Sequence, residues 1–225
     1  SYAYLFLPKQ KNNSLIIYHQ GHDGDFIKGK KTIQYFLERG YTIMAFSMPL
    51  TGMNNQPEVQ IPGYGVIKLK DHDYLYLLEN DNFSPIKLFV EPIIISLNYY
   101  EKTYKPNSVY MIGISGGAWT TTIASAIDAR ISKSFPVSGP LPMYIDANLD
   151  HSFGDYEVIN PRLNKIATML DLYILGSSGK GREQLKIINK YDSCCHYGMA
   201  YLTFYNFLDR KSTRLNSSHL CISYA

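Results

Sequence analysis

Short runs of apolar residues recur along the chain and are separated by more polar stretches. "LIIY" at 15–18 and "SVYMIGI" at 108–114 are nearly continuous apolar runs, typical of strands buried on both faces. Between such runs, Ile33, Phe36 and Leu37 recur at the spacing of one helix face. The predicted strands cover residues 2–7, 15–18, 42–49, 108–114, 131–139 and 183–191. The predicted helices cover residues 26–39, 91–103, 116–130 and 198–208.

This alternation of strands and helices predicts both the fold class and the domain organisation. It is typical of α/β proteins with a mostly parallel, doubly wound sheet that carries helices on both faces. We therefore predict one domain over residues 1–208, with cap-like excursions near 50–83 and 140–182, where no period is clear. The helix over 91–103 is expected to tolerate Pro92, because the first turn of a helix needs no N–H there.

Composition and charge narrow the class of protein. Hydrophobic residues make up 45% and charged residues 18% of the 225 residues, as in a globular protein with a packed core. No apolar run approaches the roughly 18–20 residues of a transmembrane helix, so no transmembrane segment is expected. The net charge of +3 is too small to indicate a nucleic-acid partner. The chain begins with Ser1 and no signal-peptide pattern follows, so we expect a missing N-terminus and leave localisation and oligomeric state open.

Residues 209–225 differ in kind from the rest of the chain. Residues 209–219 match the translation of a common sequencing-adapter DNA, and residues 222–225 match its continuation. We therefore treat 209–225 as a non-native tail and expect the sheet to be truncated before its last strand. The tail holds three basic residues and one acidic residue, so the net charge without it falls from +3 to +1. The role of Cys194 and Cys195 stays open.

A serine flanked by glycines ends the apolar run at 108–114. Gly113, Ser115 and Gly117 fit the pattern G-x-S-x-G, in which a serine lies on a sharp turn from a strand to a helix. Such a turn leaves no room for side chains two residues before and after the serine. It also directs the N–H of Gly116 toward the place where an oxyanion would form. The alternative is an ordinary glycine-rich turn with an incidental serine, but the strand before it and the helix after it favour a catalytic turn.

With this motif and this order of elements, residues 2–208 resemble the α/β-hydrolase superfamily of serine hydrolases. The resemblance implies that Ser115 is the nucleophile, and that the loop after an earlier strand supplies a second oxyanion donor. The matching loop is H-Q-G-H-D-G at 19–24. Its expected donor is the N–H of His22, with the N–H of Asp23 as a substitute.

The same loop allows another interpretation, because histidine and carboxylate side chains also ligate metals. His19, His22, Asp23 and Asp25 lie close together in the sequence. Their spacing on an extended loop favours no metal, and no third cluster supports one. We therefore expect neither a metal nor an organic cofactor.

The resemblance also implies an acid after the serine, at the end of a later strand. Asp192 closes the predicted strand at 183–191 and is therefore the expected acid. A carboxylate there would hold a histidine in the correct tautomer and stabilise its charged form. Asp150 and Asp171 are weaker candidates because both lie in the irregular excursion, and a solvated turn is the alternative role for Asp192.

The general base implied by the resemblance is a histidine after one more helix and one more strand. The helix predicted at 198–208 is followed by the tail, so we expect the native histidine beyond residue 208 and outside this chain. His219 has the right order but belongs to the tail, and His196 follows Asp192 too soon. The chain as written is therefore expected to be inactive, since loss of a triad member lowers the rate by about 10⁴–10⁶.

The expected activity is cleavage of a carboxylic ester, or a related acyl bond, through an acyl-enzyme, and the expected partner is a small-molecule acyl substrate. The ester specificity follows from the resemblance alone, since peptidase and thioesterase chemistry would use the same residues. A second hypothesis is a non-catalytic protein of the same fold that binds a ligand or a partner protein.

Overall fold

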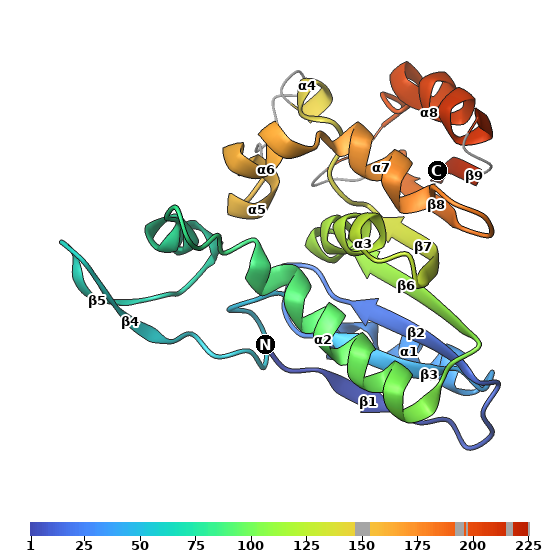
Figure 1. Cartoon of the computed structure of the whole chain (residues 1–225), viewed down its shortest axis with the longest axis horizontal. Coiled ribbons are helices and arrows are strands. Elements are labelled where there is room, and N and C mark those ends of the chain that lie inside the picture. Colours follow the sequence, from blue (N-terminus) through green and yellow to red (C-terminus); the bar gives the residue numbers. More distant parts are fainter. Residues whose placement is uncertain (147–153, 192–195, 197, 215–217, 225) are drawn as a thin grey trace.

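The central element of the protein is a mostly parallel β-sheet. The computed structural model describes residues 1–146, 154–191, 196, 198–214 and 218–224. Seven strands of this part of the chain form the sheet: β1 (Tyr4–Phe6), β2 (Ser14–His19), β3 (Thr42–Phe46), β6 (Ser108–Ile114), β7 (Ile131–Val137), β8 (Glu183–Asn189) and β9 (Ser218–Tyr224). They lie in the order β1-β3-β2-β6-β7-β8-β9 (Figure 1). β1 is antiparallel to β3, and every other neighbouring pair is parallel.

Helices cover both faces of this sheet. Three of them connect β2, β3, β6 and β7 in chain order: α1 (Lys30–Leu37), α2 (Lys87–Tyr104) and α3 (Gly116–Ile127). Ile16 and Ile43 point to the face that carries α1, while their neighbours Ile17 and Met44 point to the face that carries α2 and α3 (Figure 1). This arrangement confirms the predicted α/β fold class. Among the described residues, no helix combines the length and the apolar character needed to cross a bilayer.

The strands β2 and β3 are buried on both faces, whereas β6, β7 and β8 mix buried residues with half-buried ones. Every residue of β3 is buried, and β2 is buried from Leu15 to His19. Trp119 of α3 is 1% exposed and packs edge-on against Phe89 of α2, with ring centroids 5.4 Å apart. Replacing such a buried ring by alanine typically costs about 3–5 kcal/mol. Trp119 therefore anchors α3, the helix that begins at Gly116, against α2.

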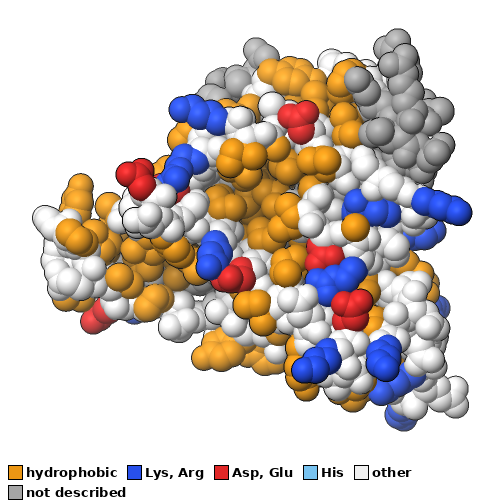
Figure 2. All heavy atoms as spheres, in the orientation of Figure 1, with side chains coloured by type: hydrophobic (Ala, Val, Ile, Leu, Met, Phe, Trp, Pro, Cys, Tyr) orange, Lys and Arg blue, Asp and Glu red, His pale blue; other side chains and the backbone are white. Residues whose placement is uncertain are grey.

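The first predicted excursion forms a hairpin arm and a short helix. β4 (Glu58–Ile61) and β5 (Gly65–Lys68) pair in antiparallel fashion, and the hairpin extends away from the sheet (Figure 1). Figure 2 shows hydrophobic side chains gathered on this arm. Tyr64 and Val66 of the hairpin are exposed. The 3-10 helix η2 (His72–Leu78) follows the arm and returns the chain to the body of the protein.

The second predicted excursion contains the crossover to β8. Its described residues form four helices: α4 (Met143–Asp146), α5 (Tyr156–Ile159), α6 (Pro161–Ile166) and α7 (Met169–Ser177). α7 packs closely on α3, because a Cβ atom on Gly176 would lie 2.8 Å from Oγ of Ser125. α7 is therefore the crossover helix between β7 and β8. Its sequence is apolar nearly all round, so it gives no contrast between faces and no clear period.

The helix that contains Pro92 begins earlier than predicted. α2 starts at Lys87, so Pro92 lies inside the helix and not in its first turn. The proline removes the N–H that would bond the carbonyl of Leu88. The helix nevertheless continues, because Phe89 and Ile93 on either side of the proline are buried in the core.

The chain continues in the sheet beyond residue 208. α8 (Leu202–Arg214) extends past the predicted end of the last helix, and β9 pairs in parallel with β8. β9 thus lies at an edge of the sheet where the sequence predicts no strand. Backbone pairing to an open sheet edge needs no particular side chain. The adapter origin of residues 209–225 therefore stays a prediction.

Candidate active site

The turn from β6 to α3 holds Ser115 in an unusual backbone conformation. Its φ is 55° and its ψ is −120°, a combination that is costly for any residue except glycine. The N–H of Ser115 donates to the carbonyl of Val137 on β7 at 2.9 Å, and its carbonyl accepts from the N–H of Ala118 at 2.8 Å. Bonds on both sides therefore hold the strained turn in place. The side chain is half-buried at the carboxyl end of β6.

Glycines at 113 and 117 leave the space that this turn requires. A Cβ atom on Gly113 would lie 2.0 Å from the carbonyl oxygen of Gly117. A Cβ atom on Gly117 would lie 2.2 Å from the carbonyl oxygen of His19 at the end of β2. Both clashes involve backbone atoms, which cannot rotate away. Any larger residue at either position would shift the turn that carries Ser115.

The loop after β2 runs directly beside Ser115. A Cβ atom on Gly21 would lie 2.8 Å from Cβ of Ser115. The preceding residue, Gln20, is fixed at both ends: its N–H donates to the carbonyl of Phe46 at 3.0 Å, and its side-chain amide donates to Asp23 at 2.7 Å. The loop is therefore held close to the serine by bonds that involve its own residues.

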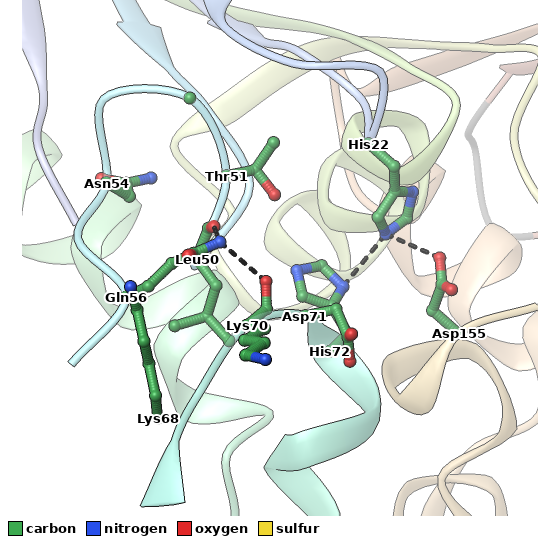
Figure 3. Close-up of a pocket in the computed structure, with 11 residues that line it drawn as sticks. His22, Leu50, Thr51, Asn54, Gln56, Lys68, Lys70, Asp71, His72 and Asp155 are labelled. Carbon is green, nitrogen blue, oxygen red and sulfur yellow. Dashed lines mark hydrogen bonds and ion pairs between the residues drawn. The ribbon is translucent and has the colours of Figure 1, made fainter. Parts of the chain in front are cut away.

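The side chain of His22 belongs to a cluster that the sequence does not predict. The His22 ring lies against Gly116, since a Cβ atom there would be 2.3 Å from Cε1 of the ring. Its Nε2 atom is 3.1 Å from Nδ1 of His72, 2.9 Å from Asp155 and 2.9 Å from Glu157. Figure 3 shows His22, His72 and Asp155 pointing toward one another from three different segments.

Burial and close pairing shift the pKa values within this cluster. Burial by itself would lower the pKa of His22, but the bonds to Asp155 and Glu157 outweigh it and raise that pKa well above its ordinary value. For Glu157 the directions are reversed. Burial by itself would raise the pKa of this carboxyl, but the bonds to His22 and His72 outweigh burial and lower the pKa. Glu157 is fully buried, and Asp155 is about half exposed. In the absence of other ligands, the cluster therefore favours charged carboxylates beside protonated imidazole.

The metal set considered from the sequence does not assemble. His19 stacks on Phe46 and its Nδ1 atom bonds the carbonyl of Gln20 at 2.9 Å. Asp23 bonds Gln20 and Lys28, and Asp25 caps η1 (Phe26–Gly29) by accepting from the N–H of Ile27. Only His22 of that set reaches a group of possible ligands. Its companions lie in the two excursions, where the sequence has no regular spacing that could have indicated them.

Of the three candidate acids, only Asp171 lies within the described residues. Asp192 and Asp150 lie outside the described residues, so the role of Asp192 stays a prediction. Asp171 forms a capping box with Thr168 at the start of α7, and the bonds from Thr168 lower the pKa of its carboxyl. The Asp171 carboxylate thus already has a structural role.

Of the two histidines that follow Ser115 in the described chain, His219 lies away from the serine. His219 pairs with Gln184, the second residue of β8, and so lies near the amino end of the parallel strands. Ser115 lies at the opposite, carboxyl end of its strand. His196 lies in a turn with a φ of 53° and is half-buried. The expectation of a histidine beyond residue 208 stays a prediction.

A cleft of about 700 Å³ opens beside the His22 cluster. It is lined by His22, His72 and Asp155 and by further residues of the first excursion, including Lys68 and Lys70 (Figure 3). Ser115 is not among its lining residues. The cleft reaches the serine turn through His22, whose ring lies against Gly116.

No protein-family model matches the sequence, and no curated protein sequence matches it. Solved structures of α/β-hydrolases do match the fold. The esterase Pf2001 of Pyrococcus furiosus has a TM-score of 0.62 at 12% identity, over 99% of this chain and 77% of that one. Est1E from Butyrivibrio proteoclasticus, with ferulic acid bound, has a TM-score of 0.58 at 17% identity, over 99% of this chain and 85% of that one.

The acylaminoacyl peptidase of Pyrococcus horikoshii also matches, with a TM-score of 0.64 at 15% identity, over 99% of this chain and 34% of the peptidase. Identities this low establish the fold alone. This chain therefore has the α/β-hydrolase fold, and its activity has to be argued from its own residues.

Proposed function

We propose that the protein is a serine hydrolase that cleaves a carboxylic ester, or a related acyl bond, through an acyl-enzyme on Ser115. The observation that carries the proposal is the backbone of Ser115, whose φ of 55° and ψ of −120° persist only because the surrounding bonds impose them. A serine held in this way, on a sharp turn between a central strand and a helix, is typical of a catalytic nucleophile. Acyl transfer is also the reaction class of the esterases and the peptidase that share the fold.

In this proposal, the hydroxyl of Ser115 attacks the acyl carbonyl and the carbonyl oxygen becomes an oxyanion. The N–H of Gly116 is the first donor, because the opening N–H groups of a helix have no partner within the helix. α3 runs for three turns behind it, so its dipole adds partial positive charge at the same place. Gly116 has no side chain that would separate this N–H from the substrate.

The second donor in this proposal is the N–H of His22. The close approach of Gly21 to Ser115, which brings this loop beside the serine, supports this assignment. The bonds of Gln20 to Phe46 and Asp23 fix the loop before the substrate arrives, so no reorganisation is needed during the reaction. Loss of one donor of this kind typically lowers the rate by about 10²–10³.

Asp192 and a histidine complete the proposed machinery. β8 ends at Asn189, so Asp192 follows the strand at the point in chain order that the resemblance implies. The histidine would take the proton from Ser115 and return it to the leaving group, while Asp192 holds the ring. We expect this histidine beyond residue 208. The histidines before Ser115 already bond other groups: His19, His22 and His72.

A serine-reactive fluorophosphonate probe tests the proposal. The protein is expressed from the open reading frame that contains residues 1–208, with whatever follows them in the gene. We expect covalent labelling, mapped by mass spectrometry to Ser115, and we expect Ser115→Ala to abolish it. The same pair is assayed for p-nitrophenyl ester hydrolysis, where loss of the nucleophile lowers kcat by about 10⁴–10⁶.

Ser138→Ala is the matched control. Ser138 follows β7, the neighbouring strand, and it also has a positive φ, of 48°. It should label as the unmodified protein does. Labelling that survives Ser115→Ala would show that another residue is the nucleophile. A folded protein that takes up no probe would favour the non-catalytic binding protein.

A further inference from the structure

Four side chains converge on one point beside the serine turn. The imidazole nitrogens and carboxylate oxygens of His22, His72, Asp155 and Glu157 all lie within 4.8 Å of one another. Nε2 of His22 alone has three of them at 2.9–3.1 Å. A ring nitrogen carries at most one hydrogen, so it cannot donate to three partners at once. A single group shared by all four side chains would satisfy every one of them.

The ring of His72 shows which of its nitrogens faces the centre without a hydrogen. Its Nε2 atom lies 2.8 Å from the carbonyl oxygen of Pro49, which can only accept, so Nε2 carries the hydrogen. In the neutral ring, Nδ1 then directs a lone pair toward Glu157, 2.9 Å away, and toward His22. A lone pair that faces a carboxylate repels it unless a proton or a cation lies between them. A ring whose far N–H is held by a backbone carbonyl is also the usual arrangement of a metal-ligating histidine.

The two carboxylates are likewise turned toward the centre. Asp155 occupies the N-cap of α5, where an aspartate normally accepts a bond from the helix backbone, yet its side chain makes no capping bond. Its Oδ2 atom lies 2.9 Å from His22 instead. Glu157, two residues later, is fully buried, and a buried carboxylate requires a compensating charge. The Asp155 carboxylate therefore adds a second negative charge to the cluster and does not cap α5.

We propose that His22, His72, Asp155 and Glu157 form a binding site for a divalent first-row metal ion. Zinc is the ion that two imidazoles and two carboxylates suit best. Zinc–ligand bonds of about 2.0–2.1 Å in a tetrahedron separate the ligand atoms by about 3.3 Å. The separations of 2.9–3.1 Å around His22 need to widen by a few tenths of an ångström, and ligand atoms as far as 4.8 Å apart need to approach by about 1.5 Å. The double positive charge of the ion would balance the two carboxylates.

The ligands are held in position by a second set of bonds nearby. The carboxylate of Glu79, just after η2, accepts bonds from the hydroxyl of Tyr156, the amide of Asn160 and the guanidinium of Arg162. This fixes the segment of His72 against the segment of Asp155 and Glu157. The adjacent cleft of about 700 Å³, lined by His22 and His72, gives an ion access from solvent.

The metal site uses the imidazole of His22, whereas the proposed hydrolase uses only its backbone N–H, and metal binding does not require Ser115 to be a nucleophile. The competing explanation is an ion-pair network in which protons bridge the histidines and carboxylates. The two explanations predict different responses to added metal.

Zinc titration of the purified 225-residue chain tests the site. The protein is stripped with a chelator, dialysed, and titrated with Zn²⁺ alone in competition with a chromophoric chelator. We expect one zinc ion per chain by elemental analysis and a Tm that rises with zinc concentration. Asp155→Asn and Glu157→Gln should each weaken zinc binding by at least about 100-fold, since loss of an outer-shell partner already costs 10–100-fold. Asp155 is 49% exposed, so its variant is expected to fold even if that of Glu157 does not.

Two controls separate this site from other zinc ligands in the chain. Asp73→Asn changes an exposed acid on η2 that lies outside the cluster, and it should leave the zinc affinity unchanged. The double variant Cys194→Ser, Cys195→Ser removes adjacent thiols that could bind zinc, and it should also leave the affinity unchanged.

Three results would overturn the proposal: no stoichiometric zinc binding, an affinity that the Asp155 and Glu157 variants leave intact, or binding that disappears with the cysteines. The first would identify the cluster as a proton-bridged network. Fluorophosphonate labelling reports on Ser115 and not on the metal, so failure of this site and failure of the hydrolase proposal are distinguishable.

Discussion

Replacing Gly113 by alanine tests the steric basis of the serine turn. The added Cβ atom would lie 2.0 Å from the carbonyl oxygen of Gly117 and 2.2 Å from Oγ1 of Thr121. Real Cβ contacts are essentially never shorter than 3.0 Å, so the first turn of α3 has to move by about 1 Å. The backbone of Gly113 does not lie in the left-handed region, so the whole effect is steric.

The expected loss of stability follows from this overlap. Overpacking of a dense core costs about 1–3 kcal/mol. We expect the upper end, about 3 kcal/mol, because one of the clashing atoms is backbone and because the bond from Thr121 to Gly117, 2.8 Å long, is disturbed as well. For a protein of this size, that corresponds to a fall in Tm of roughly 6–12 °C. Gly63→Ala is the control: nothing lies within 4 Å of its Cβ, and only the positive φ of 79° opposes alanine, at about 1–2 kcal/mol.

The assay is thermal and guanidinium unfolding followed by the fluorescence of Trp119. It is the single tryptophan of the chain, and it lies two residues beyond Gly117 in the buried first turns of α3. Circular dichroism under the same conditions checks that the signal reports global unfolding. A Tm within about 2 °C of the unmodified protein, or a loss no larger than that of Gly63→Ala, would refute the steric argument.

Three other substitutions test charge and hydrogen bonding elsewhere in the fold. Burial lowers the pKa of His19 to about 4, so the unfolding free energy should fall by up to about 3 kcal/mol as the pH drops from 6.5 through 4. His19→Asn keeps a donor and should flatten this part of the stability profile in urea; an unchanged profile would speak against a buried neutral ring. Glu79→Gln removes the charge that accepts from Tyr156 and should cost about 2 kcal/mol in urea titrations, and a loss below about 0.5 kcal/mol would contradict this. Arg130→Lys loses the paired bonds to Asp128 and should cost about 1 kcal/mol by thermal unfolding, whereas a gain in Tm would exclude that role.

The sequence predicts the fold best where a local pattern and burial agree. The strand predicted at 108–114 is found at Ser108–Ile114, because every second residue of its apolar run is buried in the core and a serine and a glycine follow it. The start of α2 is missed by four residues, since Pro92 suggested a helix beginning that core packing overrides. The crossover helix Met169–Ser177 is hidden by its uniformly apolar sequence.

In the candidate site too, the sequence predicts the part that is local in the chain and misses the part that is not. Gly113, Ser115 and Gly117 are contiguous, so one short motif indicates the turn. The His22 cluster joins residues that are 50 positions apart (His72) and 135 positions apart (Glu157) in the chain. No spacing rule connects such residues, so only the folded chain brings them together. The expectation of no metal considered only ligands close to His22 in the sequence.

The central claim is that Ser115 is the nucleophile of a hydrolase. The most direct test is a crystal structure of the protein, expressed with the residues that follow 208 in its gene, after reaction with a dialkyl p-nitrophenyl phosphate. We predict a phosphoryl group bonded to Oγ of Ser115, with one of its oxygens within hydrogen-bonding distance of the N–H groups of Gly116 and His22. An adduct on another residue, or a phosphoryl oxygen turned away from both N–H groups, would contradict the account.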